Sequence, residues 1–256
     1  MEIQGKVVVI TGGAQGIGRA IAERFGAAGA KLVLGDVQET VLEAAVAELR
    51  AKGYEVHGVA GNIAQEADAE QLMAEAGRHF GRLDVAVLNA GILRDGLLVR
   101  VDKETGAVTG KMSLQQWQSV IDVNLTGVFL TGREAAVQMI QHGNGGVILL
   151  MSSISGEGNF GQTNYAATKA GVRAMTVTWS RELARYGIRV NSIAPGFIGT
   201  PMVKQDMKPE ALEKLLKQVP VGRLGEPDEV AQVCESLVRN DFVTGVLWGV
   251  TGGMRL

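Results

Sequence analysis

The sequence predicts an α/β protein built on one doubly wound parallel sheet with helices on both faces. Short apolar, β-branched runs alternate with longer segments of helical periodicity along all 256 residues. The runs are apolar throughout rather than at every second position, which is typical of strands buried on both faces. A glycine-rich turn follows the first run, and no linker composition interrupts the alternation. We therefore expect a single domain spanning residues 1–256.

Each predicted element follows from its residue pattern. Strands are expected at the apolar runs 6–11, 31–36, 55–61, 83–91, 145–153, 188–196 and 245–250. Helices are expected between them, at 16–29, 38–52, 66–80, near 113–141 and at 163–186. In the first helix, Ile17, Ile21 and Phe25 recur every four residues and form one apolar face. Right-handed connections between such strands and helices give a parallel sheet that is covered on both sides.

Two segments depart from this alternation. Residues 93–112 place a polar DKETG turn between β-type residues, which predicts a small projecting hairpin. Residues 197–226 form a helical stretch rich in Lys and Glu after a predicted strand. An insertion at such a place is expected to act as a lid over a substrate cleft.

The composition argues against several classes of protein. A formal net charge of −2 with mixed signs does not indicate a nucleic-acid surface. No run is apolar for long enough to span a bilayer. Cys234 is the single cysteine, so neither an internal disulfide nor a thiolate metal cluster is expected. The first strand pattern begins without a signal sequence ahead of it. We therefore expect a cytoplasmic protein that binds no membrane and no metal.

The glycine-rich turn TGGAQGIG lies between the first strand and the first helix. Gly12 permits a tight turn, Gly16 lets backbone approach a pyrophosphate, and Gly18 lets the helix pack close to the strand. The helix N-terminus adds N–H donors and a partial positive charge. Any tight strand-to-helix turn uses glycine, but the position after the first strand favours a dinucleotide site.

Asp36 closes the second predicted strand. A carboxylate at this position accepts hydrogen bonds from the diol of an adenosine ribose and repels a 2′-phosphate. Its neighbours Gly35, Val37 and Gln38 supply no cation, and neither does Gln15 in the turn. The residues therefore favour NAD(H) over NADP(H). Asp36 also suits a helix N-cap before Gln38, and the two roles are compatible.

Asparagines follow the third and fourth predicted strands. Asn62 comes after the third strand, and Asn89, Ala90 and Gly91 come after the fourth. These are the carboxyl ends of strands, where sheets of this kind bind ligands. Taken alone, each asparagine suits a strand-end turn equally well.

Tyr165 and Lys169 lie four residues apart in the sequence NYAATK and share one face of the predicted helix. A phenol has a pKa of about 10, so it exchanges protons poorly at neutral pH. An ammonium nearby favours the phenolate and lowers that pKa. Without the cofactor turn upstream, the same pair is typical of an ordinary exposed helix face.

A serine cluster precedes this helix. Ser153 ends the fifth predicted strand, at the edge where the ligand crevice is expected. Its hydroxyl is placed to hydrogen-bond a substrate carbonyl and hold it against Tyr165. Alternatively, Ser152, Ser153 and Ser155 satisfy backbone groups in a turn. Asn124 lies between two predicted helices and suits a cap.

The order of TGGAQGIG, NAG, Asn124, a serine, YAATK and PGFIGT resembles the short-chain dehydrogenase/reductase family over essentially the whole chain. The resemblance implies a Rossmann-type fold and a nicotinamide cofactor. It implies that Tyr165 is the general acid/base, that Lys169 lowers its pKa and binds the nicotinamide ribose, and that a serine polarises the carbonyl. Asn124 would hold a water in the proton relay. The cofactor-binding positions are Gly12, Gln15, Gly16, Ile17, Gly18, Asp36, Asn62, Ile63, Asn89, Ala90, Gly91, Tyr165, Lys169, Pro195, Gly196, Ile198 and Thr200.

The chain departs from the family pattern in two ways. The usual spacing to Tyr165 selects Ser152, whereas alignment of the strand GVILLMSS selects Ser153. A loop loses a residue more easily than a buried strand shifts its register, so we favour Ser153. Asn62 stands where many members have Asp, which keeps an acceptor for an adenine amine and removes a charge.

The segments GILRDGLL, GNFGQTNYAATKAG and PGFIGTPM are most similar to the 3-oxoacyl-thioester reductase branch of that family. Many members of the branch prefer NADPH, which Asp36 contradicts. The alternatives are a 3-oxoacyl reductase on a carrier or CoA, a small-ketone carbonyl reductase or alcohol dehydrogenase, and a non-catalytic dinucleotide-binding protein. Basic residues near the cleft suit an acidic carrier or simple solvation: Arg94, Arg100, Lys103 and Lys111. The resemblance also implies a homotetramer, with the long helices and the C-terminal strand at its interfaces.

Overall fold

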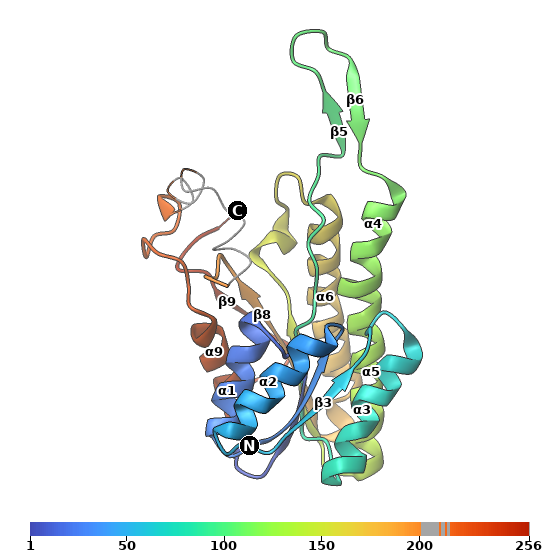
Figure 1. The fold of residues 1–256 in the computed structure, drawn as a ribbon, viewed down its shortest axis with the longest axis vertical. Helices are drawn as coiled ribbons and strands as arrows, with labels where there is room; N and C mark the ends of the chain where they lie inside the picture. The colour runs from blue at the N-terminus through green and yellow to red at the C-terminus, as the bar shows by residue number, and fades with distance from the viewer. Residues whose placement is uncertain (201–209, 211–212, 214–215, 256) are drawn as a thin grey trace.

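The computed structural model describes residues 1–200, 210, 213 and 216–255. Its centre is a seven-stranded parallel sheet with the strand order β3-β2-β1-β4-β7-β8-β9 (Figure 1). The strands are β1 (Val7–Thr11), β2 (Lys31–Asp36), β3 (Val56–Ala60), β4 (Val85–Leu88), β7 (Gly146–Met151), β8 (Ile188–Pro195) and β9 (Leu247–Val250). The order reverses between β1 and β4, so the sheet is doubly wound. The predicted fold class is confirmed.

Helices cover both faces of the sheet (Figure 1). One layer contains α1 (Gly16–Ala27), α2 (Glu39–Ala51) and α9 (Pro227–Arg239), and the other contains α3 (Glu66–Phe80), α4 (Leu114–Ile121), α5 (Val128–His142) and α6 (Thr163–Glu182). Within β1, Val8 and Ile10 belong to the apolar core under the first layer, whereas Val7 and Val9 belong to the core under the second. Successive strand residues point to opposite faces, so strands buried on both faces are apolar throughout.

The segment 93–112 contains an antiparallel hairpin of β5 (Val99–Val101) and β6 (Val108–Lys111). Figure 1 shows the hairpin projecting beyond the end of the helices. At its tip, Asp102 accepts hydrogen bonds from the backbone N–H groups of Glu104 and Thr105, which closes the DKETG turn. The polar turn residues therefore form the turn that the sequence predicts.

The helical region near 113–141 is one continuous helical stretch. Between α4 and α5, residues Asp122–Gly127 adopt a π-helical conformation. Asn124 lies in this segment and is fully buried, so it is not a cap between two separate helices. A π-helical turn inside an α-helix often marks a functional site, because it changes which side chains share a face.

Several element ends differ from the predicted ones. β7 ends at Met151, so both candidate serines lie just outside the strand. α6 ends at Glu182 and continues as a short 3₁₀ turn at Ala184–Tyr186. β9 begins at Leu247 because Gly245 turns the chain with a φ of 74°. Part of the expected lid at 197–226, namely positions 201–209, 211–212 and 214–215, lies outside the described residues.

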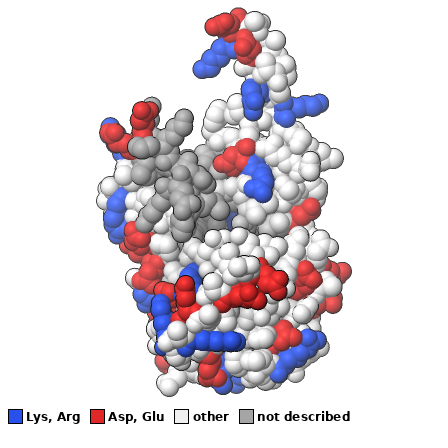
Figure 2. All heavy atoms as spheres, in the orientation of Figure 1, with Lys and Arg blue, Asp and Glu red and all other residues white. Residues whose placement is uncertain are grey.

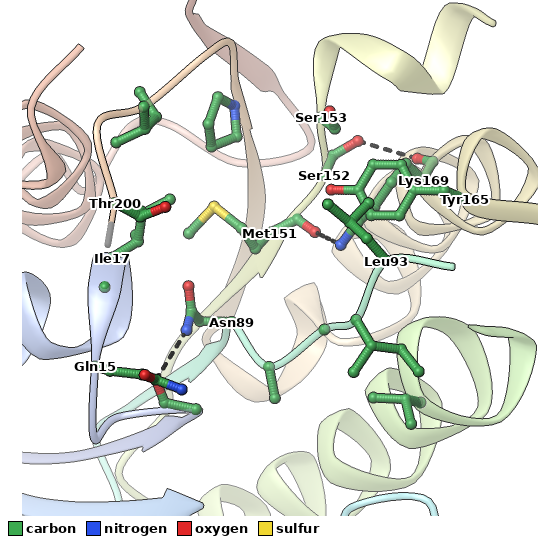
Figure 3. Close-up of a pocket in the computed structure, with 18 of the residues that line it drawn as sticks. Gln15, Ile17, Asn89, Leu93, Met151, Ser152, Ser153, Tyr165, Lys169 and Thr200 are labelled. Atoms are coloured by element: carbon green, nitrogen blue, oxygen red, sulfur yellow. Dashed lines mark hydrogen bonds between the residues drawn. The ribbon is translucent and has the colours of Figure 1, made fainter. Parts of the chain in front are cut away.

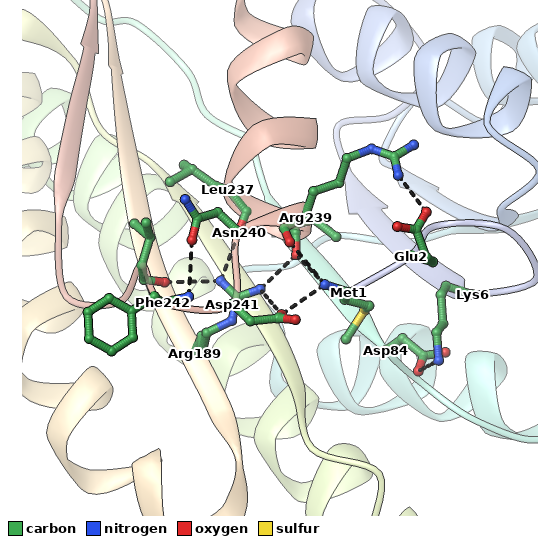
Figure 4. Close-up of polar contacts among 12 residues, drawn as sticks. Met1, Glu2, Lys6, Asp84, Arg189, Leu237, Arg239, Asn240, Asp241 and Phe242 are labelled. Atoms are coloured by element: carbon green, nitrogen blue, oxygen red, sulfur yellow. Dashed lines mark hydrogen bonds and ion pairs between the residues drawn. The ribbon is translucent and has the colours of Figure 1, made fainter.

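At the C-terminal end of α9, two positively charged groups contact backbone carbonyls of the helix (Figure 4). The amine of Met1 donates to the carbonyl of Arg239 at 3.1 Å and pairs with Asp241 at 2.8 Å. Arg189 donates to the carbonyls of Leu237 and Val238, both at 2.7 Å. Positive charge is favourable at a helix C-terminus, where carbonyls lack helical partners. These contacts join the first residues and β8 to α9, far from the carboxyl edge of the sheet.

No helix within the described part of the chain is both long enough and apolar enough to cross a membrane.

Candidate active site

A cavity of about 490 Å³ lies at the carboxyl edge of the sheet, where the strand order reverses. Figure 3 shows Gln15, Ile17 and Thr200 on one side of it and Ser153, Tyr165 and Lys169 on the other. The sequence-predicted residues that line it are Gly12, Gln15, Gly16, Ile17, Asp36, Asn62, Ile63, Asn89, Ala90, Gly91, Ser153, Tyr165, Lys169, Pro195, Gly196, Ile198 and Thr200.

Two predicted site residues, Gly18 and Asn124, do not line the cavity. Each instead contacts a residue that does: Gly18 packs against Gly12, and Asn124 bonds to Ile92. Ser152, the alternative serine of the sequence analysis, also lines the cavity. Other lining residues had not been predicted: Gly35, Val37, Gln38, Gly61, Ile92, Leu93, Val123, Met151, Ile154, Ser155, Asn159, Gln162 and Phe197. Most of them adjoin a predicted residue in the sequence. Their position next to a strand end could therefore have identified them as lining residues. Asn159 and Gln162 precede Tyr165 by a few residues, and only the fold of their loop brings them to the cavity.

The glycine turn between β1 and α1 has the geometry that a bound phosphate requires. Gly12 and Gly16 have φ values of 63° and 56°, which side-chain-bearing residues rarely adopt. A Cβ on Gly18 would lie 2.0 Å from the carbonyl oxygen of Gly12, so only glycine lets α1 start this close to β1. The N-cap residue Gln15 makes no side-chain capping bond within the described residues, and Gln15, Gly16 and Ile17 at this helix start line the cavity.

Asp36 ends β2 at the far end of the cavity from Tyr165. Its carboxylate accepts hydrogen bonds from the backbone N–H groups of Ala14, at 3.4 Å, and Gln38, at 3.1 Å. Helix α2 starts at Glu39 with Gln38 as its N-cap, so Asp36 is not the cap residue. The carboxylate instead joins the glycine turn to the start of α2 while still lining the cavity.

The two asparagines at strand ends fix the shape of the turns around them. The side chain of Asn89 donates to the carbonyls of Thr11 and Gly12, at 3.1 and 3.2 Å, and so connects β4 to the glycine turn. The Oδ1 atom of Asn62 accepts the N–H of Ala64 at 3.1 Å. Both asparagines therefore form strand-end turns and also line the cavity.

The adjacent serines have different partners. Ser152 is buried, and its hydroxyl donates to the main-chain oxygen of Lys169 at 3.0 Å. The side chain of Ser153 acts on the phenol of Tyr165 as a hydrogen-bonding group that lowers its pKa, and its Oγ accepts the N–H of Ser155 at 3.1 Å. A serine hydroxyl has one hydrogen to donate. Ser152 has used that hydrogen on the helix, whereas Ser153 directs its hydroxyl toward Tyr165.

On one face of α6, Lys169 is buried and Tyr165 is half-buried. The Nζ of Lys169 donates to the carbonyl of Met151 at 2.8 Å and lies 5.4 Å from the centre of the Tyr165 ring. Burial lowers the pKa of Lys169 to about 8, because the charged form loses its hydration.

The pKa of Tyr165 in the protein without a cofactor is set mainly by burial, and its lowering by Lys169 stays a prediction. Burial raises the pKa of Tyr165 to about 12, and the hydrogen bond from Ser153 opposes this, whereas the negative charge of Asp95 adds to it. Desolvation of the phenolate outweighs the other effects, and Nζ of Lys169 is bonded to the carbonyl of Met151.

Asn124 supports the cavity wall from the π-helical segment. Its Oδ1 accepts the N–H of Ile92 at 2.8 Å, and its Nδ2 donates to the carbonyl of the same residue at 2.9 Å. A Cβ on the adjacent Gly91 would lie 3.3 Å from Oδ1 and 3.7 Å from the Nζ of Lys169. The side chain of Asn124 therefore fixes the backbone beside Lys169, and its role in a water relay stays a prediction.

These residues fit a dinucleotide. The N-terminus of α1 and the glycine turn suit a pyrophosphate, and Asp36 presents a carboxylate where a ribose diol would lie. At the other end, the half-buried Tyr165 and the buried Lys169 and Ser153 line the cavity where a reacting carbonyl would sit. The fold and this arrangement define a dinucleotide-dependent oxidoreductase.

A family model for the short chain dehydrogenases matches residues 6–211, and the chain belongs to this family of oxidoreductases, which bind a nicotinamide dinucleotide. Over 256 residues the chain is 41% identical to the 3-oxoacyl-[acyl-carrier-protein] reductase FabG of Thermotoga maritima, with 99% of each chain covered. It is 40% identical over 253 residues to the 3-oxoacyl-[acyl-carrier-protein] reductase of Synechocystis sp., with 97% of this chain and 96% of the relative covered. The crystal structure of levodione reductase superposes with a TM-score of 0.87 at 35% identity, covering 98% of this chain and 97% of that one.

Proposed function

We propose that this protein is an NAD(H)-dependent ketoreductase that interconverts a ketone or β-keto group and a secondary alcohol. The observation that carries the proposal is the placement of Ser153, Tyr165 and Lys169 at one end of a cavity whose other end holds Asp36. The relatives support the reaction class, because two are named for reduction of a 3-oxoacyl group and one for reduction of levodione.

In the proposed reaction, Tyr165 gives its phenolic proton to the carbonyl oxygen during reduction and takes it back during oxidation. Ser153 hydrogen-bonds the same oxygen and aligns it with the phenol. Lys169 holds a positive charge next to both groups when it is protonated, which favours transient negative charge on either oxygen. The bound nicotinamide supplies or accepts the hydride.

The preference for NAD(H) rests on charge at the adenosine end. Among the described residues that line the cavity, Asp36 and Lys169 are the charged ones, and Lys169 belongs to the opposite end. A 2′-phosphate would therefore meet the Asp36 carboxylate without a cation from the described lining to balance it. We propose that NADH is preferred, although many members of the 3-oxoacyl-thioester branch use NADPH.

The substrate side favours a neutral carbonyl compound. Apolar side chains contribute to the lining of the cavity, with Ile92, Leu93, Ile154 and Phe197 among them. No arginine in the described cavity lining is placed to bind a substrate carboxylate. A β-keto thioester, a β-keto ester and a simple ketone all satisfy this condition, whereas a free keto acid does not.

The charged side chains near the cleft do not favour a carrier-protein dock. On the hairpin, Arg100 and Lys103 alternate with Asp102 and Glu104. Figure 2 shows blue and red atoms close together on the hairpin rather than a patch of one sign. An acidic partner needs a surface of predominantly positive potential. We therefore keep the acyl-thioester reductase and the small-ketone reductase as alternatives within one proposed reaction.

A non-catalytic dinucleotide-binding protein is the alternative outside this class. Loss of one reacting side chain is a simple route to such a protein, but Ser153, Tyr165 and Lys169 are all present and gathered at the cavity. The arrangement therefore favours catalysis.

The test is oxidation of NADH, followed by absorbance, with short β-keto thioesters, β-keto esters and simple ketones. We expect turnover with at least one class, and loss of turnover in Tyr165→Phe with NADH affinity nearly unchanged, because the phenol transfers a proton and does not hold the adenosine. Turnover that survives in Tyr165→Phe would remove Tyr165 from its proposed role. Binding of NADH without turnover of any class would favour the non-catalytic alternative.

We also propose a homotetramer. Apolar side chains are exposed on the long helices, with Phe129, Val137 and Ile140 on α5 and Val177 on α6. On the edge strand β9, the Trp248 side chain is 41% exposed, so the strand is not buried in the monomer core. Exposed apolar faces of this kind mark interfaces between subunits. Light scattering coupled to gel filtration should give four times the monomer mass of 27.0 kDa.

A further inference from the structure

We infer that Arg173 is a positioning residue that holds Ser153 against Tyr165, and that the proton-transfer geometry depends on it while cofactor binding does not. The inference rests on the proposed function, because it assigns a role within the same site. It concerns a residue that does not line the cavity.

Arg173 occupies the third position of a stripe along α6. Tyr165, Lys169 and Arg173 are spaced by four residues, so they lie on neighbouring turns of one helix face. The guanidinium donates from Nη2 to the main-chain oxygen of Ser153 at 2.7 Å and from Nε toward the Oγ of Ser152 at 3.4 Å. Thus one helix carries both the proposed acid/base and the group that holds its serine partner.

The loop that begins at Ser153 is short and mostly bonded to itself. The N–H groups of Ser155 and Gly156 bond to Ser153, and the N–H of Gly158 bonds to Ser155. These bonds shape the 3₁₀ turn (Ile154–Glu157) but do not fix it relative to α6. The side-chain hydrogen bonds that link residues 153–157 to α6 are those of Arg173, and the Ser152–Lys169 bond joins the preceding residue to the same helix.

The guanidinium also packs directly on the turn. A Cβ placed on Gly156 would lie 2.8 Å from the Nε of Arg173, so glycine at this position lets the guanidinium approach the backbone. On its outer side, Arg173 pairs with Glu157 at 3.1 Å. The planar guanidinium therefore contacts the turn at its start, middle and end.

A surface ion pair between Arg173 and Glu157 explains only the outermost of these contacts. Such pairs contribute little, because both charges remain hydrated. The side chain of Arg173 is only 20% exposed, and its shortest bond is to the carbonyl of Ser153 rather than to the carboxylate. Its rigid fork of donors suits simultaneous contact with several oxygens, which a lysine cannot reproduce.

The first experiment compares Arg173→Met with wild type in the assay that establishes turnover. Loss of the contacts lets Ser153 move relative to Tyr165, and displacement of a reacting group by about 1 Å lowers rate by about 10²-fold. We expect kcat to fall by roughly this factor, with the KM for NADH and its dissociation constant nearly unchanged. Arg173→Lys should recover part of kcat, because one donor remains. Arg181→Met is the matched control, since Arg181 is exposed farther along the same helix.

A double-variant cycle separates positioning from a general loss of stability. If Arg173 acts through Ser153, then adding Ser153→Ala to Arg173→Met should lower kcat little further, because the serine is already misplaced. Independent, multiplicative losses would overturn the inference. An unchanged kcat in Arg173→Met would overturn it as well.

Two further measurements keep the inference testable if Arg173→Met fails to fold. Gly156→Ala directs a methyl group at the guanidinium, a flexible side-chain end, so the variant should fold while the guanidinium is displaced. We expect Gly156→Ala to have a lower kcat than wild type, as Arg173→Lys does. A kcat equal to that of wild type would contradict the inference.

The second measurement is hydrogen exchange, which requires no activity. Amides of residues 155–158 should exchange faster in Arg173→Lys and Gly156→Ala than in Arg181→Met. Equal exchange would contradict the anchoring role even if the proposed function were correct. Absence of turnover in the wild type would instead reject the proposed function and leave the anchoring result standing.

Discussion

The hydroxyl of Ser152 donates a hydrogen bond to the main-chain oxygen of Lys169, 3.0 Å away. This bond fixes the strand end to α6 one residue before Ser153, whose own hydroxyl meets Tyr165. The two adjacent serines therefore have different roles: Ser152 bonds the end of the strand to α6, and Ser153 interacts with the phenol of Tyr165. The difference can be tested with a matched pair of alanine substitutions.

Ser153→Ala should lower kcat on the order of 10²–10³-fold, the usual effect of removing a hydrogen-bond donor to a reacting oxygen. Ser152→Ala should lower kcat far less and reduce the free energy of unfolding by about 1 kcal/mol, because it loses a buried hydrogen bond. Steady-state kinetics and urea denaturation of both variants check this. A larger kcat loss in Ser152→Ala would assign the proposed catalytic role to the wrong serine.

Substitution of Asp36 should change the choice of cofactor. Asp36→Asn keeps an acceptor for the N–H groups of Ala14 and Gln38 but removes the charge that repels a 2′-phosphate. We expect NADH to bind roughly 10-fold more weakly, since a hydrogen bond to a charged acceptor is lost, and NADPH to bind more tightly than to wild type. Fluorescence titration with both cofactors measures this.

The control for this charge effect is Glu39→Gln, an equal change of net charge on an exposed residue at the start of α2. It should leave the ratio of the two affinities unaltered. An identical shift in both variants would attribute the preference to the general field of the protein rather than to Asp36.

The fold and most of the residues that line the cavity could be predicted from the sequence, because both depend on local sequence patterns. Strands buried on both faces have to be apolar throughout, and ligand-binding residues of such a sheet have to follow strand ends, as Asp36 and Asn89 do. The difference between Ser152 and Ser153 depends on contacts with Lys169 and Arg173, which are distant in the sequence. Strand register could not decide it, since β7 ends before either serine.

Other features were not predictable for energetic reasons. The sequence shows Lys169 one turn from Tyr165 and therefore suggests that the ammonium lowers the pKa of the phenol. Only the structure shows that Nζ is bonded to the carbonyl of Met151 and that desolvation is the largest influence on the pKa of each group. Similarly, helical periodicity does not reveal the π-helical turn that buries Asn124.

Asn124→Ala should destabilise the protein and impair the site. The substitution leaves the partly buried N–H and carbonyl of Ile92 without their partner, at a cost of roughly 1 kcal/mol for each lost hydrogen bond. Because Ile92 lines the cavity, kcat should fall as well. Urea denaturation with Gln118→Ala as the control, an exposed residue in the preceding turn, measures the difference. Equal stability of the two variants would show that the contact with Ile92 contributes nothing.

Lys169→Met is expected to be more stable than wild type at pH 7 and inactive. Burial lowers the pKa of Lys169 from 10.5 to about 8, so the folded protein holds a proton there at a cost of about 3 kcal/mol below pH 8. Methionine avoids this cost but loses the bond to Met151, worth about 1 kcal/mol. The net gain in the free energy of unfolding should therefore be about 2 kcal/mol.

The pH dependence of that gain follows from the direction of the pKa change. Between pH 8 and 10.5 the unfolded wild-type chain binds more protons at Lys169 than the folded protein does, so wild-type stability rises with pH in this window. The variant lacks this titration, and its advantage should shrink as pH rises. Urea denaturation of both proteins from pH 7 to about pH 9.5 tests this, and stops below the range where tyrosines ionise in the unfolded chain. A stability difference that stays constant across this range would show that Lys169 is not desolvated as its burial implies.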